Sequence, residues 1–299
     1  MKWSSEFNRF LPVVVVVTLI FVIAAVFLLD HCGYLLSYPD TAREGVWQSA
    51  VFSFLALLTS WCYVLSVTTP AGRIPDTSEW LYAESEQVGV SSSLVVSETK
   101  RDGRRRACKW CAKWKPDRCH HCRVCKACVL RMDHHCPWIG SCVGHGNHKP
   151  FLLLLLYATI TCVFVAVCTG YHFERRMVQT STEFAASVFG LSLVILSSCL
   201  SLVVGAFFLF HLYLTANALT TIEYCEKMRS VDFDPGTYNR GVYGNFKNVL
   251  GESIWLWFIP VGLDNGDGLG WFKTSKQDDW VAPETDAPKI EEASKPLLP

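Results

Sequence analysis

Four long apolar stretches set the main limit on how this chain can fold. They cover about 11–29, 46–67, 151–171 and 185–214, and none contains Lys, Arg, Asp or Glu. A helix needs roughly 20 apolar residues to cross the core of a bilayer, so each stretch is long enough. The run at 12–29 also exceeds the roughly 7–15-residue core of a cleaved signal peptide. We therefore predict an all-α integral membrane protein with four transmembrane helices.

The distribution of basic residues predicts the orientation of these helices. Segment 73–150 is rich in Lys and Arg, whereas the loop at 30–45 contains only Arg43 and the loop at 172–184 only Arg175 and Arg176. Loops with an excess of Lys and Arg remain in the cytosol. We expect segment 73–150 and both termini to be cytosolic. The chain has 27 basic and 27 acidic residues, so its net charge points to no partner, and we predict no nucleic-acid partner.

Composition divides the chain into six segments. The region before Cys108 is polar and then basic, which is typical of a flexible linker, and the last segment is rich in Pro, Lys, Asp and Glu. The predicted segments are transmembrane helices 1 and 2 (1–72), a cytosolic linker (73–107), a zinc domain (108–150), transmembrane helices 3 and 4 (151–216), a cytosolic C-terminal region (217–272) and a disordered tail (273–299).

One metal-ligand pattern occurs twice in the cysteine-rich segment, with an offset of fourteen residues. Each copy contains three cysteines and one histidine, which is the inventory of a closed tetrahedral zinc site. The ligands are Cys108, Cys111, His121 and Cys128 in the first copy, and Cys122, Cys125, His135 and Cys142 in the second. The copies interleave, so two structural Zn²⁺ ions would tie β-hairpin-like turns together. The alternative is a single zinc ion with several free cysteines. His145 and His148, which follow the last ligand, could compete for metal.

Cys136 is left over from both ligand sets. It would open a third copy of the pattern, but the next ligand position holds Ile139. A thiol beside a histidine is a candidate nucleophile, and His134 shares a strand face with it, so His134 could act as general base. Asp133 could orient that imidazole if the chain bends locally. The alternative is that Cys136 is a buried, inert thiol.

The position of Cys136 suggests its substrate. A reactive thiol at the cytosolic mouth of four helices can take an acyl group whose tail enters the bilayer, and the cytosolic activated form of a fatty acid is its coenzyme A thioester. Four basic residues of the zinc domain could contact the anionic coenzyme A, or could reflect topology alone. They are Arg118, Arg123, Lys126 and Arg131.

The segment from Cys108 to Phe151 closely resembles the DHHC protein S-acyltransferases. The resemblance rests on the runs at 115–122 (KPDRCHHC) and 132–138 (MDHHCPW), on Cys142-Val143-Gly144 with Asn147, and on Thr220-Thr221-Ile222-Glu223. It implies that Cys136 attacks palmitoyl-CoA, that a protein cysteine then receives the palmitoyl group, and that His134 and Asp133 serve as base and orienting acid. It further implies that Thr220, Thr221, Glu223 and Asn245 brace the site, and that Trp138 lies near the cavity mouth. We expect a multi-pass protein of the endomembrane system or plasma membrane.

Two expectations concern specificity and alternative functions. Thr161 lies about 15 Å along its helix from Phe151, so we expect it to lie near the end of the acyl chain. A catalytically silent zinc adaptor is the main alternative function. A channel is disfavoured because His211 is the only candidate ionisable pathway residue in a span. The sequence leaves open the protein substrates, the compartment, the oligomeric state and whether Cys225 is acylated.

Overall fold

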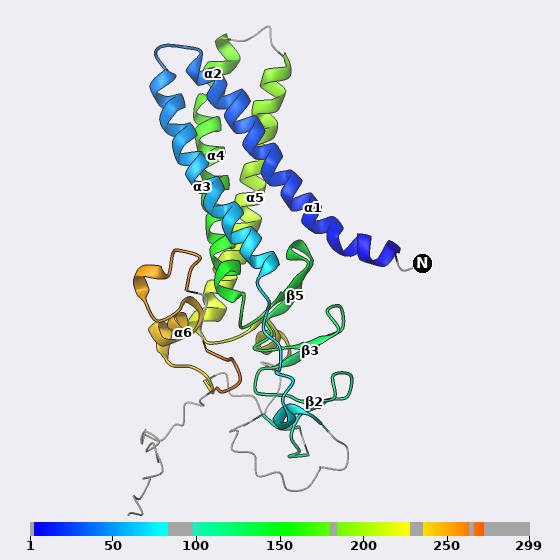
Figure 1. Ribbon diagram of the computed structural model, residues 1–299. Coiled ribbons are helices and arrows are strands. Elements are labelled where there is room, and N and C mark those ends of the chain that lie inside the picture. Colours follow the sequence, from blue (N-terminus) through cyan, green and yellow to red (C-terminus); the bar gives the residue numbers. More distant parts are fainter. Residues whose placement is uncertain are drawn as a thin grey trace, which may run out of the picture.

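The structure is a bundle of long helices that stands on a small hairpin-rich module (Figure 1). The computed structural model describes residues 3–82, 98–100, 102–179, 184–227, 236–262 and 266–271. Four helices are long and apolar enough to cross a membrane, which agrees with the predicted fold class. The candidate spans are Phe10–Leu36, Ala42–Thr68, His148–Phe173 and Val188–Ala216.

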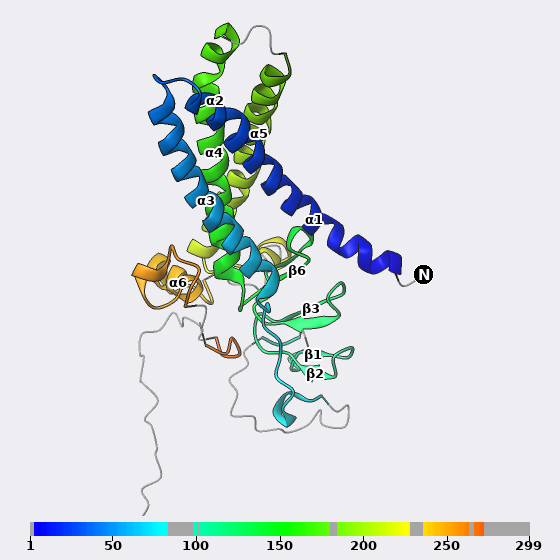
Figure 2. The same cartoon turned by 45° about the horizontal axis from the view of Figure 1, so that its top comes forward.

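The helices extend beyond the apolar stretches at both ends and include polar flanking residues. The first span is built from three consecutive helical pieces, and a π-helical turn separates its two α-helical parts. In both views α1 leans away from the other helices towards its N-terminus (Figures 1 and 2). The helical elements of the bundle are α1 (Trp3–Ala25), η1 (Val26–Cys32), α2 (Gly33–Leu36), α3 (Ala42–Thr68), α4 (His148–Gln179) and α5 (Phe184–Ala216).

The cysteine-rich segment forms antiparallel hairpins that repeat with the fourteen-residue offset of the ligand pattern. The strands are β1 (Ala107–Cys108), β2 (Lys113–Trp114), β3 (His120–Cys122), β4 (Ala127–Val129), β5 (His134–Cys136) and β6 (Ser141–Val143). They pair as β1–β2, β3–β4 and β5–β6. Hairpin β5–β6 lies nearest the bundle, and β3–β4 and β1–β2 follow at increasing distance (Figures 1 and 2).

The turns of the hairpins repeat as well. Ala112, Lys126 and Gly140, which are fourteen residues apart, all have positive φ angles of 47°, 52° and 62°. Such a left-handed residue closes each tight turn. The third turn contains the short 3₁₀ helix η4 (Pro137–Ile139). The third hairpin therefore has the backbone of a zinc-binding turn although the sequence gives it no second cysteine.

The described ends of the predicted linker pack on the module. Ile74 and Trp80 are buried against Cys108 and Cys119, and Trp80 belongs to the short helix η2 (Ser78–Trp80). Apolar side chains at both positions explain why these ends pack on the module. Residues 83–97 and 101 of that linker, and the tail predicted at 273–299, lie outside the described residues.

The C-terminal region returns to the base of the bundle. It contains η5 (Glu223–Lys227), α6 (Gly241–Leu250) and η6 (Ile254–Leu256). Val249 and Leu250 of α6 form a buried cluster with Leu152 of α4. The aromatic stretch around η6 is exposed, with Trp255 at 86% and Phe258 at 63%. Such exposed aromatic side chains suit a position at the membrane interface, where tryptophan is enriched.

Candidate active site

Asp133 and His134 form a hydrogen-bonded pair at the start of β5. Because β5 begins at His134, Asp133 lies outside the strand and need not follow its alternation. Its backbone N–H donates to the carbonyl of Val143 over 2.9 Å. His134 Nδ1 lies 2.6 Å from Oδ2 of Asp133, so Nδ1 carries the hydrogen and Nε2 is left as an acceptor. The pair is thus arranged as an oriented base.

Further contacts fix the Asp133 carboxylate, which is fully buried. Thr221 donates twice to it, from its backbone N–H to Oδ1 over 3.0 Å and from its hydroxyl to Oδ2 over 2.8 Å. Burial raises the pKa of Asp133, but the hydrogen bond from His134 and nearby imidazoles outweigh it and hold the pKa well below its usual range. The carboxylate is therefore ionised.

Cys136 ends β5 and faces the same imidazole. Its side chain is 6% exposed and hydrogen-bonds with His134. Burial lowers the pKa of His134, whereas the hydrogen bonds with Asp133 and Cys136 raise it by more, so the imidazole is a strong base for the proton of the Cys136 thiol. The structure thus brings the three predicted residues Asp133, His134 and Cys136 into one line of contacts.

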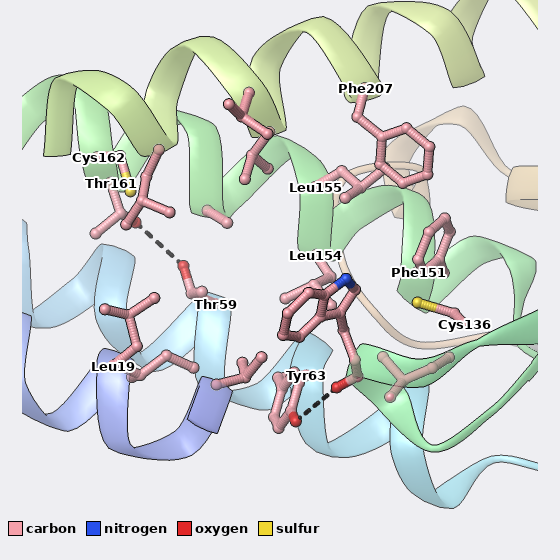
Figure 3. Close-up of a pocket in the computed structure, with 18 of the residues that line it drawn as sticks. Leu19, Thr59, Tyr63, Cys136, Phe151, Leu154, Leu155, Thr161, Cys162 and Phe207 are labelled. Atoms are coloured by element: carbon pink, nitrogen blue, oxygen red, sulfur yellow. Dashed lines mark hydrogen bonds between the residues drawn. The ribbon is translucent and has the colours of Figure 1, made fainter. Parts of the chain in front are cut away.

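A largely apolar cavity of about 890 Å³ extends from Cys136 into the bundle. Figure 3 shows Cys136 beside Phe151 at one end, with Thr161 and Cys162 at the other. Helices α1, α3, α4 and α5 all contribute to its walls, together with the turn after β5. Its shape and lining suit a long hydrocarbon chain.

The residues predicted at the two ends of this cavity both line it. Trp138, in the turn after β5, is 57% exposed, and its backbone carbonyl accepts a hydrogen bond from the Tyr63 hydroxyl over 3.0 Å. Thr161 is buried on α4, and its hydroxyl lies 3.1 Å from that of Thr59 on α3 (Figure 3). This contact joins two helices across the inner end of the cavity.

The eight predicted metal ligands gather into two groups of four. In the first group, Nδ1 of His121 lies 3.3–3.8 Å from its three sulfur atoms. In the second, Nδ1 of His135 lies 3.4–3.7 Å from its three sulfur atoms. A tetrahedral zinc ion with ordinary Zn–S and Zn–N bonds separates such atoms by about 3.5 Å. Both groups therefore fit a closed, structural zinc site with four protein ligands.

Comparison with known proteins points to one family. Residues 101–228 match the family model described as DHHC palmitoyltransferase. Palmitoyltransferase ZDHHC15A of Danio rerio is 30% identical over 277 residues, which cover 86% of this chain and 82% of that protein. Probable protein S-acyltransferase 16 of Arabidopsis thaliana is 34% identical over 239 residues, which cover 77% of this chain and 81% of that protein.

The chain belongs to the DHHC palmitoyltransferase family. Its class of enzyme is accordingly the protein-cysteine S-palmitoyltransferase, and the four apolar helices make it a multi-pass membrane protein. The two Cys₃His groups agree with the zinc-binding module of this family.

A buried ion pair fixes the position of the segment that contains Thr221. Arg118 donates to both carboxylate oxygens of Glu223, over 2.8 Å and 2.7 Å, and both side chains are buried. Glu223 in turn accepts from the backbone N–H of Thr220 over 2.9 Å. Such a bidentate pair has a fixed geometry. It therefore sets the position of the Thr220–Thr221 segment against the zinc module.

Asn245 holds the end of α5 against α6. Its amide N–H₂ donates to the backbone carbonyl of Ala216 and to Asn239, and its side-chain oxygen accepts from the backbone of Arg240. This contact set keeps α6 beside the chain that leads into Thr220 and Thr221. Asn245 therefore contacts backbone and other side chains, rather than Asp133 itself.

Two of the four basic residues expected at the coenzyme A surface lie inside the protein. Arg118 is 2% exposed and Arg131 is 3% exposed, so neither can contact a bound ligand at the surface. Arg131 instead lies 3.0 Å from Nδ1 of His148. His148 and His145, the two other metal candidates, lie outside both Cys₃His groups, and His145 contacts the carbonyl of Gly266. The sequence showed charge at Arg118 and Arg131 but not their buried partners.

Proposed function

We propose that this protein transfers a palmitoyl group from palmitoyl-CoA to cysteine thiols of other proteins through a thioester on Cys136. One observation carries the proposal: Asp133, His134 and Cys136 line up at the end of an apolar cavity inside four membrane-spanning helices. A thiol beside an oriented imidazole is activated as a nucleophile. The cavity gives the hydrocarbon tail of an acyl thioester a place to lie.

The first step forms the acyl-enzyme. Nε2 of His134 accepts the proton of the Cys136 thiol while the sulfur attacks the carbonyl carbon of palmitoyl-CoA. The bond between that carbon and the sulfur of coenzyme A breaks, and the departing coenzyme A thiolate takes the proton from His134. Asp133 stabilises the imidazolium between these events and keeps its orientation. One thioester replaces another, so the step is close to isoenergetic.

The second step delivers the acyl group. A cysteine thiol of the protein substrate gives its proton to His134 and attacks the acyl carbon on Cys136. The bond between that carbon and Sγ of Cys136 breaks, and Cys136 recovers a proton from His134. The two Cys₃His groups would each hold a zinc ion with four protein ligands, and such ions would supply structural cross-links rather than take part in the reaction.

The basic segment 73–150 supports a cytosolic position for this module. Palmitoyl-CoA and protein substrates with accessible cysteines would then meet Cys136 from the cytosol. Of the basic residues considered for coenzyme A, Arg123 and Lys126 are both exposed, so these two are available to its phosphates.

Labelling of the purified full chain tests the proposal. The protein in lipid nanodiscs is incubated with radiolabelled palmitoyl-CoA, and its zinc content is measured in parallel. We expect a hydroxylamine-sensitive label that disappears in Cys136→Ser, while two zinc ions per chain are kept. Cys225→Ser, which changes an exposed cysteine next to Glu223, serves as the matched control and should keep the label. A zinc-loaded wild type without label would favour a catalytically silent adaptor.

We further propose that Thr161 sets the preferred acyl-chain length. It lines the inner end of the cavity, and its hydrogen bond to Thr59 closes the gap between α3 and α4 there. Thr161→Phe would fill that end, so the preference between C16 and C14 acyl-CoA should shift towards C14 by about tenfold, the effect of one or two methylene groups. Competition between the two donors measures this, with Thr161→Ser as the control. An unchanged ratio would rule Thr161 out.

A further inference from the structure

Two buried histidines lie close to Asp133. His211 on α5 is 1% exposed, and neither of its ring nitrogens has a hydrogen-bond partner among the described residues. His148 is the first residue of α4, and its Nε2 is also buried with no hydrogen-bond partner in the described part of the chain. Nδ1 of His211 lies 4.0 Å from Oδ2 of Asp133. Buried polar atoms of this kind require an explanation, because most such atoms in folded proteins are paired.

A metal ion is one candidate occupant. One ligand atom from each of Asp133, His148 and His211 lies within 4.8 Å of the other two, and two histidines with a carboxylate can bind a transition metal. Arg131 argues against this, because its guanidinium lies 3.0 Å from Nδ1 of His148 and can only donate. Nδ1 must accept, so Nε2 carries the hydrogen and has no lone pair for a metal. The guanidinium would also repel a cation.

The same tautomer leaves Nε2–H of His148 as a free donor within the described residues, and a ring nitrogen of His148 lies within 4.8 Å of a carboxylate oxygen of Asp133. The carboxylate of Asp133 already accepts from His134 and twice from Thr221. A carboxylate has about four acceptor positions, two on each oxygen, and because Oδ2 already accepts twice, the position that is left is on Oδ1. This position matters most when His134 becomes an imidazolium, because Asp133 must then stay ionised and in place.

We propose that His211 and His148 are positioning residues for the acylation step. They hold Asp133 in the orientation that aligns His134, and Arg131 fixes the tautomer of His148. The inference rests on the proposed function of Cys136. His211 also packs against Phe207 at 4.5 Å and Phe151 at 5.3 Å between ring centroids, and both phenylalanines line the acyl cavity. One ring therefore joins the cavity wall to the carboxylate.

Rates of Cys136 acylation in full-length, nanodisc-embedded variants test this. His211→Phe keeps the ring volume and removes both nitrogens, whereas His211→Asn keeps an N–H close to the position of Nδ1. We expect His211→Phe to lower the acylation rate at saturating palmitoyl-CoA about tenfold, with the apparent KM changed less than twofold. His211→Asn should stay within about threefold of wild type. Ser197→Ala, a buried change on the same helix outside the cavity lining, should leave the rate unchanged.

The outcomes separate the two proposals. A wild-type rate in His211→Phe would overturn the inference, and so would an equal loss in the Phe and Asn variants when both keep two zinc ions. If His211→Phe does not accumulate as zinc-loaded protein, His148→Phe against His148→Gln makes the same comparison, and equal rates there would overturn it. A wild type that is never labelled would instead contradict the proposed function.

Discussion

Hairpins β3–β4 and β5–β6 have nearly the same backbone and different chemistry. Their strands differ by fourteen residues, and their turns both close on a residue with positive φ, Lys126 in one and Gly140 in the other. The turn of β3–β4 (the second turn of the module) presents two cysteines to a Cys₃His group. At the same two positions the turn of β5–β6 (the third turn) has Cys136 and Ile139, and Cys136 faces His134 instead of a metal site. A repeated metal-binding scaffold thus supplies the frame for a free thiol.

Contacts with the helix bundle stabilise the third hairpin (β5–β6), whose turn lacks the second cysteine of a metal-binding pair. Ile139 is 2% exposed and packs in one cluster with Tyr63 and Phe151. The hydroxyl of Tyr63 also donates to the backbone of Trp138 in the same turn. Apolar packing and a hydrogen bond therefore hold this turn, whereas a zinc ion would hold the corresponding turn of β3–β4. The other side of the hairpin still carries the zinc ligands His135 and Cys142.

The largest effect should separate scaffold cysteines from the thiol. Cys125→Ser removes a ligand whose metal site contributes on the order of 10 kcal/mol to folding, so we expect loss of one zinc ion and of the acyl label together. Cys136→Ser should lose the label and keep both ions. Zinc analysis by mass spectrometry and labelling of the same samples measure both. If Cys125→Ser kept two ions, the assignment of the second ligand set would be wrong.

A second test converts the third turn into a copy of the second. Ile139→Cys creates a Cys-x₂-Cys pair with Cys136, and mild oxidation with copper phenanthroline should join the two thiols in a disulfide. We expect labelling to fall at least tenfold after oxidation and to return with dithiothreitol, because only a free thiolate attacks. Ile139→Val, which cannot form the bond, is the control. Labelling that survives oxidation would show that the turns differ in geometry.

The third prediction concerns the Arg118–Glu223 ion pair, which links the zinc module to the segment that contains Thr221. Arg118→Met leaves the Glu223 carboxylate buried without its partner, which should cost about 3–5 kcal/mol. Glu223→Leu should have a similar cost from the other side, whereas the double variant should recover much of the loss. Thermal melting in detergent, followed by tryptophan fluorescence, ranks the stabilities of the wild type, the two single variants and the double variant. Additive losses in the double variant would mean that the two residues act independently.

The parts that could be predicted from the sequence are those encoded locally. Apolar runs and the fourteen-residue offset fix the spans and both ligand sets, since each depends on residues close in the chain. The family resemblance implied a bracing role for Glu223, but its partner could not be predicted, because Arg118 and Glu223 are about one hundred positions apart and a charged residue is usually exposed. His211 did stand out as an ionisable residue in a span, but its place close to Asp133 required the fold.

The smallest expected effect lies at the turn residue itself. A side chain at positive φ costs about 1 kcal/mol relative to glycine, so Lys126→Gly should stabilise the β3–β4 turn by roughly that amount. Gly140→Ala should destabilise the protein by a similar amount or more, because a Cβ there would approach Val13 of α1 to 3.3 Å as well as strain the backbone. Melting temperatures of the two variants check the opposite signs. Equal signs would mean that the two turns, despite their shared backbone, respond to different constraints.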